Sequence, residues 1–346
     1  TSGNRELLLD EVYNLNRCQT TNNEKTNNNC VIRLLDVLED RYAVHLITEL
    51  CEGGELHDYI TKEHDRTGMG LRGKALSADS RFGVYERDES RCAYVVKQIL
   101  IAFSYLHETA KVCHRDAKAS NFVFLKKPSY VEGSLELRMV DFGLSAFVGS
   151  AKEDHDDRTT RFTGGDETMK HEEEIDSKWD SQGRRSMTSE VGTPYYVSPE
   201  VLEQQNGVGY TIQCDMWSVG VLAFLTLTGD FPVMGEDEKE TLQQLMDPNL
   251  EIDFSDATLW EQSEDDVDVY DPKKRPRISN AARIFCKALL HVNPTKRPTA
   301  REALGFDWIM QHCGESSLSL DTKIAHKQQL CRLPSLSASI LEENGE

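Results

Sequence analysis

A short polar run, His114–Asn121, constrains the fold and chemistry of this chain more than any other feature. It places a carboxylate, a cation and an amide on one short loop, at Asp116, Lys118 and Asn121. Phosphoryl transfer needs a carboxylate to accept a hydroxyl proton, a cation beside the moving phosphoryl group, and oxygen ligands for magnesium. The run therefore indicates a phosphoryl-transfer site. The alternative is a chance run of polar loop residues.

A second motif, Asp141-Phe142-Gly143, follows the first at the distance of a β-hairpin. The segment 137–140 directly before it predicts a short strand, so Asp141 would leave a strand end. A carboxylate in that position can bind the metal ion that bridges nucleotide phosphates. A motif of only three residues can occur by chance, but its position after His114–Asn121 favours a functional pair of motifs.

Three further motifs lie downstream: Gly192–Glu200, Asp215–Gly220 and Asn293–Pro298. We interpret them as structural positions. A buried carboxylate at Glu200 needs a cationic partner, because an unpaired buried charge is costly. Arg297 is the candidate for that partner.

The hydrophobic pattern predicts an α+β fold that becomes mostly helical after about residue 190. We expect helices at 5–16, 53–60 and 85–110, a hairpin of 30–37 with 42–50, strands at 122–125 and 137–140, and helices to about residue 311. Polar stretches near 62–84, 150–190 and 261–276 are expected to be inserts, because they are rich in charged and small residues.

The net charge and the cysteine content indicate which kinds of binding partner and which cellular compartment suit the chain. The net charge of -20 disfavours nucleic acid or an anionic membrane as the main partner and leaves a basic peptide open as a partner. The nine cysteines are odd in number and form no CxxC pair, which indicates reduced thiols and a cytoplasmic protein, with the nucleus as an alternative. The longest apolar stretch, 216–227, is too short to span a membrane.

With five motifs in this order, the chain resembles the protein kinase family over roughly residues 5–311. Lys118 and the segment Gly192–Glu200 resemble serine/threonine kinases rather than tyrosine kinases. Glu49–Leu56, Asn121–Phe124 and Glu251–Phe254 resemble the calcium/calmodulin-dependent group, including the calcium-dependent kinases. The resemblance implies a bilobal fold and transfer of the ATP γ-phosphate to protein Ser/Thr, with ATP and Mg²⁺ as cofactors.

The resemblance also implies a role for individual residues. Catalysis would use Asp116, Lys118 and Thr193, and Mg²⁺ would be bound by Asn121 and Asp141. ATP would be bound by Glu11, Glu49, Cys51, Glu55 and Val123; for Glu11 the alternative is an ordinary solvated glutamate. Structural positions would be His114, Arg115, Phe142, Gly143, Glu200, Asp215 and Arg297.

The resemblance divides the chain into three parts. Residues 1–52 would be a partial small lobe, 53–311 a helical large lobe with the three inserts, and 312–346 a regulatory or disordered tail. Only ten residues precede Glu11, and they contain neither a glycine-rich phosphate loop nor a strand lysine. We therefore expect a fragment with weak or no phosphotransfer; the alternative is a pseudokinase, a scaffold or binding module.

Two departures and one match bear on substrates and regulation. Ala117 and Ser120 replace the usual Leu and Glu of the catalytic loop, whereas Glu55 still predicts a preference for Arg three residues before the target. The candidate phosphorylation sites are Thr188, Ser189 and Ser335, and their alternative is plain exposed hydroxyls.

The basic tail segment 324–333 is a candidate site for calmodulin or a calcium-sensor domain, and a solvated tail is its alternative. No EF-hand loop is present, so direct calcium binding is not expected.

Overall fold

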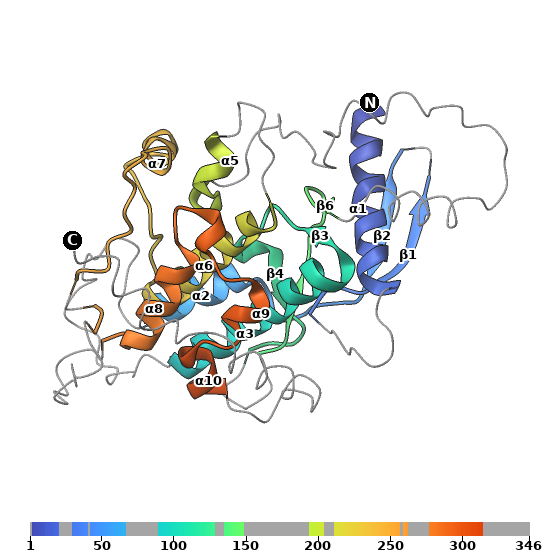
Figure 1. The fold of residues 1–346 in the computed structure, drawn as a ribbon. Helices are drawn as coiled ribbons and strands as arrows, with labels where there is room; N and C mark the ends of the chain where they lie inside the picture. Colours follow the sequence, from blue (N-terminus) through green and yellow to red (C-terminus); the bar gives the residue numbers. More distant parts are fainter. Residues whose placement is uncertain are drawn as a thin grey trace.

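The structure is a computed structural model that describes residues 2–20, 30–40, 42–66, 89–128, 135–148, 194–203, 211–256, 259–261 and 277–313. Within these ranges the chain forms helices and three separate two-stranded sheets. The α+β fold class predicted from the sequence is confirmed. The regions with strands lie around one end of the molecule, and helices make up the rest (Figure 1).

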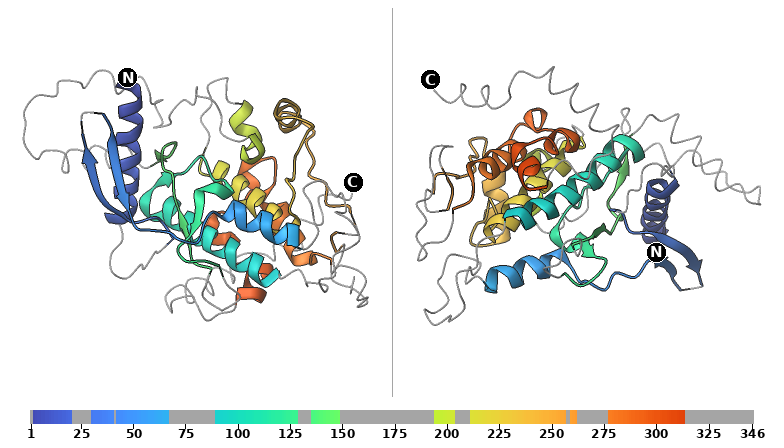
Figure 2. Two further views of the ribbon diagram at one scale, coloured as in Figure 1. Left: turned by 180° about the vertical axis from the view of Figure 1, so that it is seen from behind. Right: turned by 90° about the horizontal axis from the view of Figure 1, so that it is seen from below.

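One end of the molecule holds helix α1 (Ser2–Thr20) and the antiparallel hairpin of β1 (Leu34–Glu39) and β2 (Val44–Thr48). The views of Figure 2 agree that these elements lie beside the helical region rather than within it. Asp40 forms the turn, since its Oδ1 accepts hydrogen bonds from the backbone N–H groups of Tyr42 (2.6 Å) and Ala43 (2.9 Å). The predicted hairpin is confirmed.

The helical region is built around α3 (Glu89–Tyr105) and α6 (Gln213–Thr228). Every residue of α6 from Cys214 onward is buried, as expected for a helix that is apolar on all sides. Gly220 lets α8 approach, because a Cβ there would lie 2.9 Å from the Cβ of Leu289. The surrounding helices are α2 (Leu56–Arg66), α5 (Pro199–Glu203), α7 (Glu238–Leu245), α8 (Asn280–Leu289), α9 (Ala300–Ala303) and α10 (Asp307–Cys313).

Several of these helices begin at residues that cap them. Asp237 accepts a 2.8 Å hydrogen bond from the N–H of Glu240 at the start of α7. Thr299 and Glu302 form a reciprocal capping box at α9. α6 ends at Gly229, whose φ of 81° lies in the left-handed region that glycine adopts without strain. Local sequence therefore fixes where these helices start and stop.

Two short sheets position the candidate site. β3 (Val112–Cys113) pairs with β6 (Ala146–Phe147), and β4 (Phe122–Phe124) pairs with β5 (Leu137–Met139). A 3-10 turn, Ala119–Asn121, leads directly into β4. The chain segments that carry the two leading motifs therefore lie side by side.

Several expected boundaries were wrong. α1 continues to Thr20, and α2 continues to Arg66, into the range predicted as an insert. α3 ends at Tyr105 and is followed by a π-helical turn, Leu106–Ala110. The apolar face predicted for this helix is buried, at Val95, Ile99, Phe103 and Leu106.

The remaining inserts and the tail fall largely outside the described residues, including residues 67–84, 150–190, 262–276 and 314–346. Trp260 and Ile278 form a parallel bridge, so the residues that flank the third insert lie next to each other. Further 3-10 turns lie at Pro194–Tyr196 and Pro294–Lys296. Among the described helices, none has the length and apolar character needed to cross a membrane.

Candidate active site

The loop after β3 brings an acid, a cation and an amide into contact. Lys118 Nζ lies 2.6 Å from Asp116 Oδ2. Asn121 Nδ2 donates to the backbone carbonyl of Asp116 (2.9 Å) and to its Oδ2 (3.1 Å). Because the amide nitrogen of Asn121 faces Asp116, its Oδ1 is directed elsewhere and suits a metal ion.

A buried carboxylate on α6, that of Asp215, fixes the backbone of this loop. Asp215 accepts hydrogen bonds from the backbone N–H groups of His114 (2.9 Å) and Arg115 (2.8 Å), and from His107 Nε2 (2.8 Å). Burial works to raise the pKa of Asp215, but these donors outweigh it and the pKa is lowered. Arg115 has a φ of 70°, a left-handed conformation that is unfavourable for a non-glycine residue and that the paired Asp215 contacts help to hold.

The Asp141-Phe142-Gly143 motif lies directly beside the loop. The N–H of Val140 donates to the backbone carbonyl of Asn121 (2.9 Å). Asp141 is the next residue after Val140, so it leaves β5 close to Asn121. The Phe142 ring is buried, with its centroid 5.1 Å from the ring of His114. Burial lowers the pKa of His114, although neighbouring carboxylates oppose the shift. The Gly143 N–H donates to Asp141 Oδ1 (3.3 Å), and Asp141 has a φ of 64°.

Glu11 on α1 points to the same motif. Its carboxylate is half-buried, and burial and the charge of Asp141 raise its pKa, while a hydrogen bond from the Phe142 backbone lowers it. α1 is fixed on this side by Arg17, whose Nε donates to the carbonyl of Ala110 (2.7 Å). Glu11 is therefore not fully solvated, and its role in ATP binding stays a prediction.

The segment 49–54, here called the hinge segment, joins the hairpin to α2. Its C-terminal half is bonded to β4: the N–H of Gly53 donates to the carbonyl of Phe124, and the N–H of Phe124 donates to the carbonyl of Gly54, both at 2.9 Å. Glu55 forms a bridge with Val123. The hinge segment and Glu55 are therefore held against β4, which contains Val123.

The Glu49 side chain has a partner that the sequence analysis missed, Arg138 on β5, whose Nε lies 3.1 Å from Glu49 Oε1. The available signal was a charged residue inside a short, otherwise apolar strand. The sequence analysis also missed Arg17. In both cases the partner is distant in sequence.

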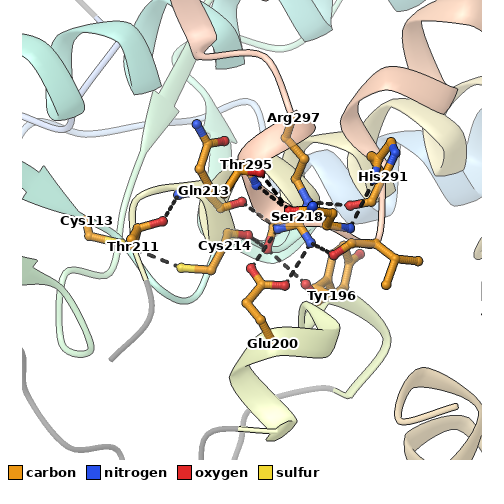
Figure 3. A network of polar contacts seen from close by, with 12 residues as sticks. Cys113, Tyr196, Glu200, Thr211, Gln213, Cys214, Ser218, His291, Thr295 and Arg297 are labelled. Atoms are coloured by element: carbon orange, nitrogen blue, oxygen red, sulfur yellow. Dashed lines mark hydrogen bonds and ion pairs between the residues drawn. The ribbon is translucent and has the colours of Figure 1, made fainter. Parts of the chain in front are cut away.

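The Glu200–Arg297 pair is present and well buried (Figure 3). Arg297 Nη1 and Nη2 each lie 2.7 Å from a different carboxylate oxygen of Glu200. Arg297 also donates to the carbonyls of His291 (2.7 Å) and Gln213 (2.9 Å), and its guanidinium lies over the Trp217 ring. α5, α6 and the segment around Pro294 are therefore joined through one side chain.

Four predicted site residues lie outside the described residues: Thr193, Thr188, Ser189 and Ser335. The catalytic assignment of Thr193 and the three candidate phosphorylation sites stay predictions. In the described part of the chain, the cysteines form no disulfide bonds.

Comparisons with known proteins identify the family. Residues 10–309 match the protein kinase domain. The chain is 28% identical over 309 residues to calcium-dependent protein kinase 25 of Arabidopsis thaliana, covering 89% of this chain and 43% of that protein. It is 30% identical over 294 residues to calcium-dependent protein kinase 3 of Plasmodium yoelii yoelii, covering 85% of this chain and 39% of that protein.

A third relative, the CDPK-related protein kinase of Daucus carota, is 28% identical over 284 residues, which cover 82% of this chain and 34% of that protein. The chain therefore spans less than half the length of each of these relatives. The family match covers most of the chain, and it coincides with the segments that carry the described site. The chain belongs to the protein kinase family and is distantly related to the calcium-dependent protein kinases.

Proposed function

We propose that this chain is the catalytic part of a protein serine/threonine kinase, which transfers the ATP γ-phosphate to Ser or Thr of a protein substrate. One observation carries the proposal: Asp116, Lys118 and Asn121 contact one another, and Asp141 directly follows Val140, whose N–H donates to the Asn121 carbonyl. We assign residues 1–52 to the small lobe, 53–311 to the large lobe and 312–346 to a regulatory tail.

The contacts support a separate task for each side chain. Asp116 would accept the proton of the substrate hydroxyl, since its carboxylate is held by Asn121 and Lys118. Lys118 would place its ammonium beside the phosphoryl group in transit. Asp215 holds the backbone of this loop, so the geometry exists before a substrate binds.

The donor set suits a magnesium-bound nucleotide. Asn121 Oδ1 and the carboxylate of Asp141 supply the hard oxygen ligands that Mg²⁺ prefers. Mg²⁺ held by Asn121 and Asp141 would offset the negative charge of the nucleotide phosphates. The hinge segment with Glu49 and Cys51, the floor residue Val123 and the ribose-side residue Glu55 would hold the nucleoside.

The substrate side favours a basic peptide. Glu55 is exposed beside the proposed nucleotide edge, and the chain carries a net charge of -20. We infer a preference for Arg three residues before the target hydroxyl, with Ser120 supplying no second acid in the catalytic loop. The relatives' names describe calcium-dependent kinases, and we propose that the tail segment 324–333 receives a calcium sensor.

The test is transfer of labelled γ-phosphate to peptides with and without Arg at that position, with and without calcium and calmodulin. Asp116→Asn is expected to lower the rate by about 10²–10⁴-fold because the proton acceptor is lost. Thermal unfolding of the variant should stay close to that of the wild type. A transfer rate that Asp116→Asn leaves unchanged would instead support the scaffold alternative. Equal use of both peptides would remove the arginine preference.

A further inference from the structure

The side chain of Glu49 joins three segments at the edge of the candidate site. Its Oε1 accepts a hydrogen bond from the backbone N–H of Arg33 (2.9 Å) and another from Arg138 Nε (3.1 Å). The backbone N–H of Glu49 donates in return to the carbonyl of Arg33 (2.9 Å). Arg33 precedes β1, Glu49 follows β2 and Arg138 is in β5. One carboxylate therefore ties the base of the hairpin to the small sheet beside the catalytic loop.

The Glu49–Arg138 pair is shielded from water. The side chain of Arg138 is 8% exposed and that of Glu49 is 16% exposed. Arg138 Nη1 also donates to the carbonyl of Leu137 (3.1 Å), which fixes the guanidinium along β5. An exposed ion pair contributes little, but removal of one partner of a buried pair leaves an uncompensated charge. This pair can therefore restrain the backbone on either side of it.

The hinge segment is held at both of its ends. At the far end, the N–H groups of Glu52 and Gly53 donate to the carbonyls of Leu125 (3.1 Å) and Phe124 (2.9 Å). A Cβ at Gly53 would lie 2.3 Å from the carbonyl oxygen of Lys126, so only glycine permits this approach. The Glu49 contacts form the near end.

Leu50 and Cys51 lie between the two fixed ends. Within the part of the chain that the structure describes, their backbone groups have no hydrogen-bond partner. Burial and the charge of Glu49 raise the pKa of the Cys51 thiol, and the charge of Arg138 opposes this shift. The N–H and carbonyl groups at these two positions have the donor and acceptor character needed to bind the edge of a purine.

We propose that Arg138 is a positioning residue, which acts through Glu49 to fix the direction of the Leu50 and Cys51 backbone groups toward a bound adenine. The identity of the ligand rests on the proposed function; the restraint on the hinge segment rests on the contacts alone. Arg138 itself touches neither the nucleotide phosphates nor the substrate hydroxyl in this assignment.

Hydrogen exchange of the 346-residue chain without nucleotide tests the restraint. Arg138→Met keeps most of the aliphatic stem but loses the charge, and Glu49→Gln keeps an acceptor for Arg33 while weakening the ion pair. In both variants, the hydrogen-bonded amides of Glu49, Glu52 and Gly53 are expected to exchange about tenfold faster, the effect of losing one charge-assisted hydrogen bond. Arg138→Lys should restore part of the protection.

Arg301→Met is the matched control, because Arg301 forms an ion pair with Glu108 far from the hinge segment. It should leave exchange at 49–54 unchanged. Unchanged exchange in both Arg138→Met and Glu49→Gln, or equal acceleration in Arg301→Met, overturns the proposal.

Calorimetric titration with Mg-ADP tests the link to the nucleotide. Arg138→Met should weaken binding about tenfold, and Arg138→Lys and Arg301→Met should bind nearly as the wild type does. Faster exchange with unchanged affinity overturns the positioning role. A wild-type chain that binds no nucleotide overturns the proposed function instead, and the exchange measurement still decides whether Arg138 restrains the hinge segment.

Discussion

The helical region and the β1–β2 hairpin bury their apolar side chains to very different extents. Every residue of α6 from Cys214 to Thr228 is buried. On the hairpin, Leu35 is 55% exposed, Leu38 is 51% exposed and Ile47 is 41% exposed. The helical region contains its own core, whereas the hairpin is held mainly at its base, through Arg33 and Glu49. Substitutions of buried side chains in the helical region should therefore lower the free energy of unfolding. Most substitutions in the hairpin should change it little.

The largest expected effect comes from the ion pair that joins α5 to the rest of the helical region. Arg297→Met leaves Glu200 without its cation in a buried site, and should lower the free energy of unfolding by about 3–5 kcal/mol. Urea denaturation followed by circular dichroism measures this. Arg301→Met removes an exposed pair of the same type, and should cost less than about 1 kcal/mol. Equal losses in the two variants would contradict the difference in burial.

A matched pair of leucines tests the comparison directly. Leu222 is fully buried in α6 and Leu38 is half-exposed on β1. Leu222→Ala should lower the free energy of unfolding by about 2–5 kcal/mol, through lost burial and a residual cavity. Leu38→Ala should change it by less than about 0.5 kcal/mol. A large loss in Leu38→Ala would show that the hairpin face is covered in solution, and the two regions would then differ less than their exposure indicates.

The sequence predicted those parts of the molecule that depend on local pattern. The hairpin follows from two apolar runs separated by a turn at Asp40, and the buried face of α3 follows from helical spacing at Val95, Ile99 and Phe103. The contact between Glu200 and Arg297 could be predicted because a buried charge requires an opposite one. Each of these needs only spacing or charge balance.

Contacts between distant segments could not be predicted in the same way. Arg138 meets Glu49 across 89 residues, and Arg17 meets the carbonyl of Ala110 across 93. Periodicity identifies which face of an element is buried, but it does not identify the segment that packs against that face. For the same reason, the sequence placed Glu11 on a helix without indicating that its carboxylate would meet Phe142 and Asp141.

Glu11 gives the smallest expected effect, at the contact between the two regions. Burial and the charge of Asp141 raise its pKa above the ordinary value of 4.5. The folded state then binds the proton more tightly than the unfolded state, so Glu11 favours folding only while it is protonated. As the pH rises from near 4.5 through the raised pKa, this contribution is lost and the unfolding free energy should fall.

Glu11→Gln should remove that part of the pH dependence, because glutamine does not titrate. The urea midpoint measured across this pH range tests it, with the exposed Glu251→Gln as the control. A wild type and a Glu11→Gln variant with parallel pH profiles would mean that the Glu11 carboxylate does not face Asp141 in solution. In that case α1 would still be attached to the helical region by contacts such as those of Arg17 and Asn14, but the site would lack the contribution of the Glu11 carboxylate.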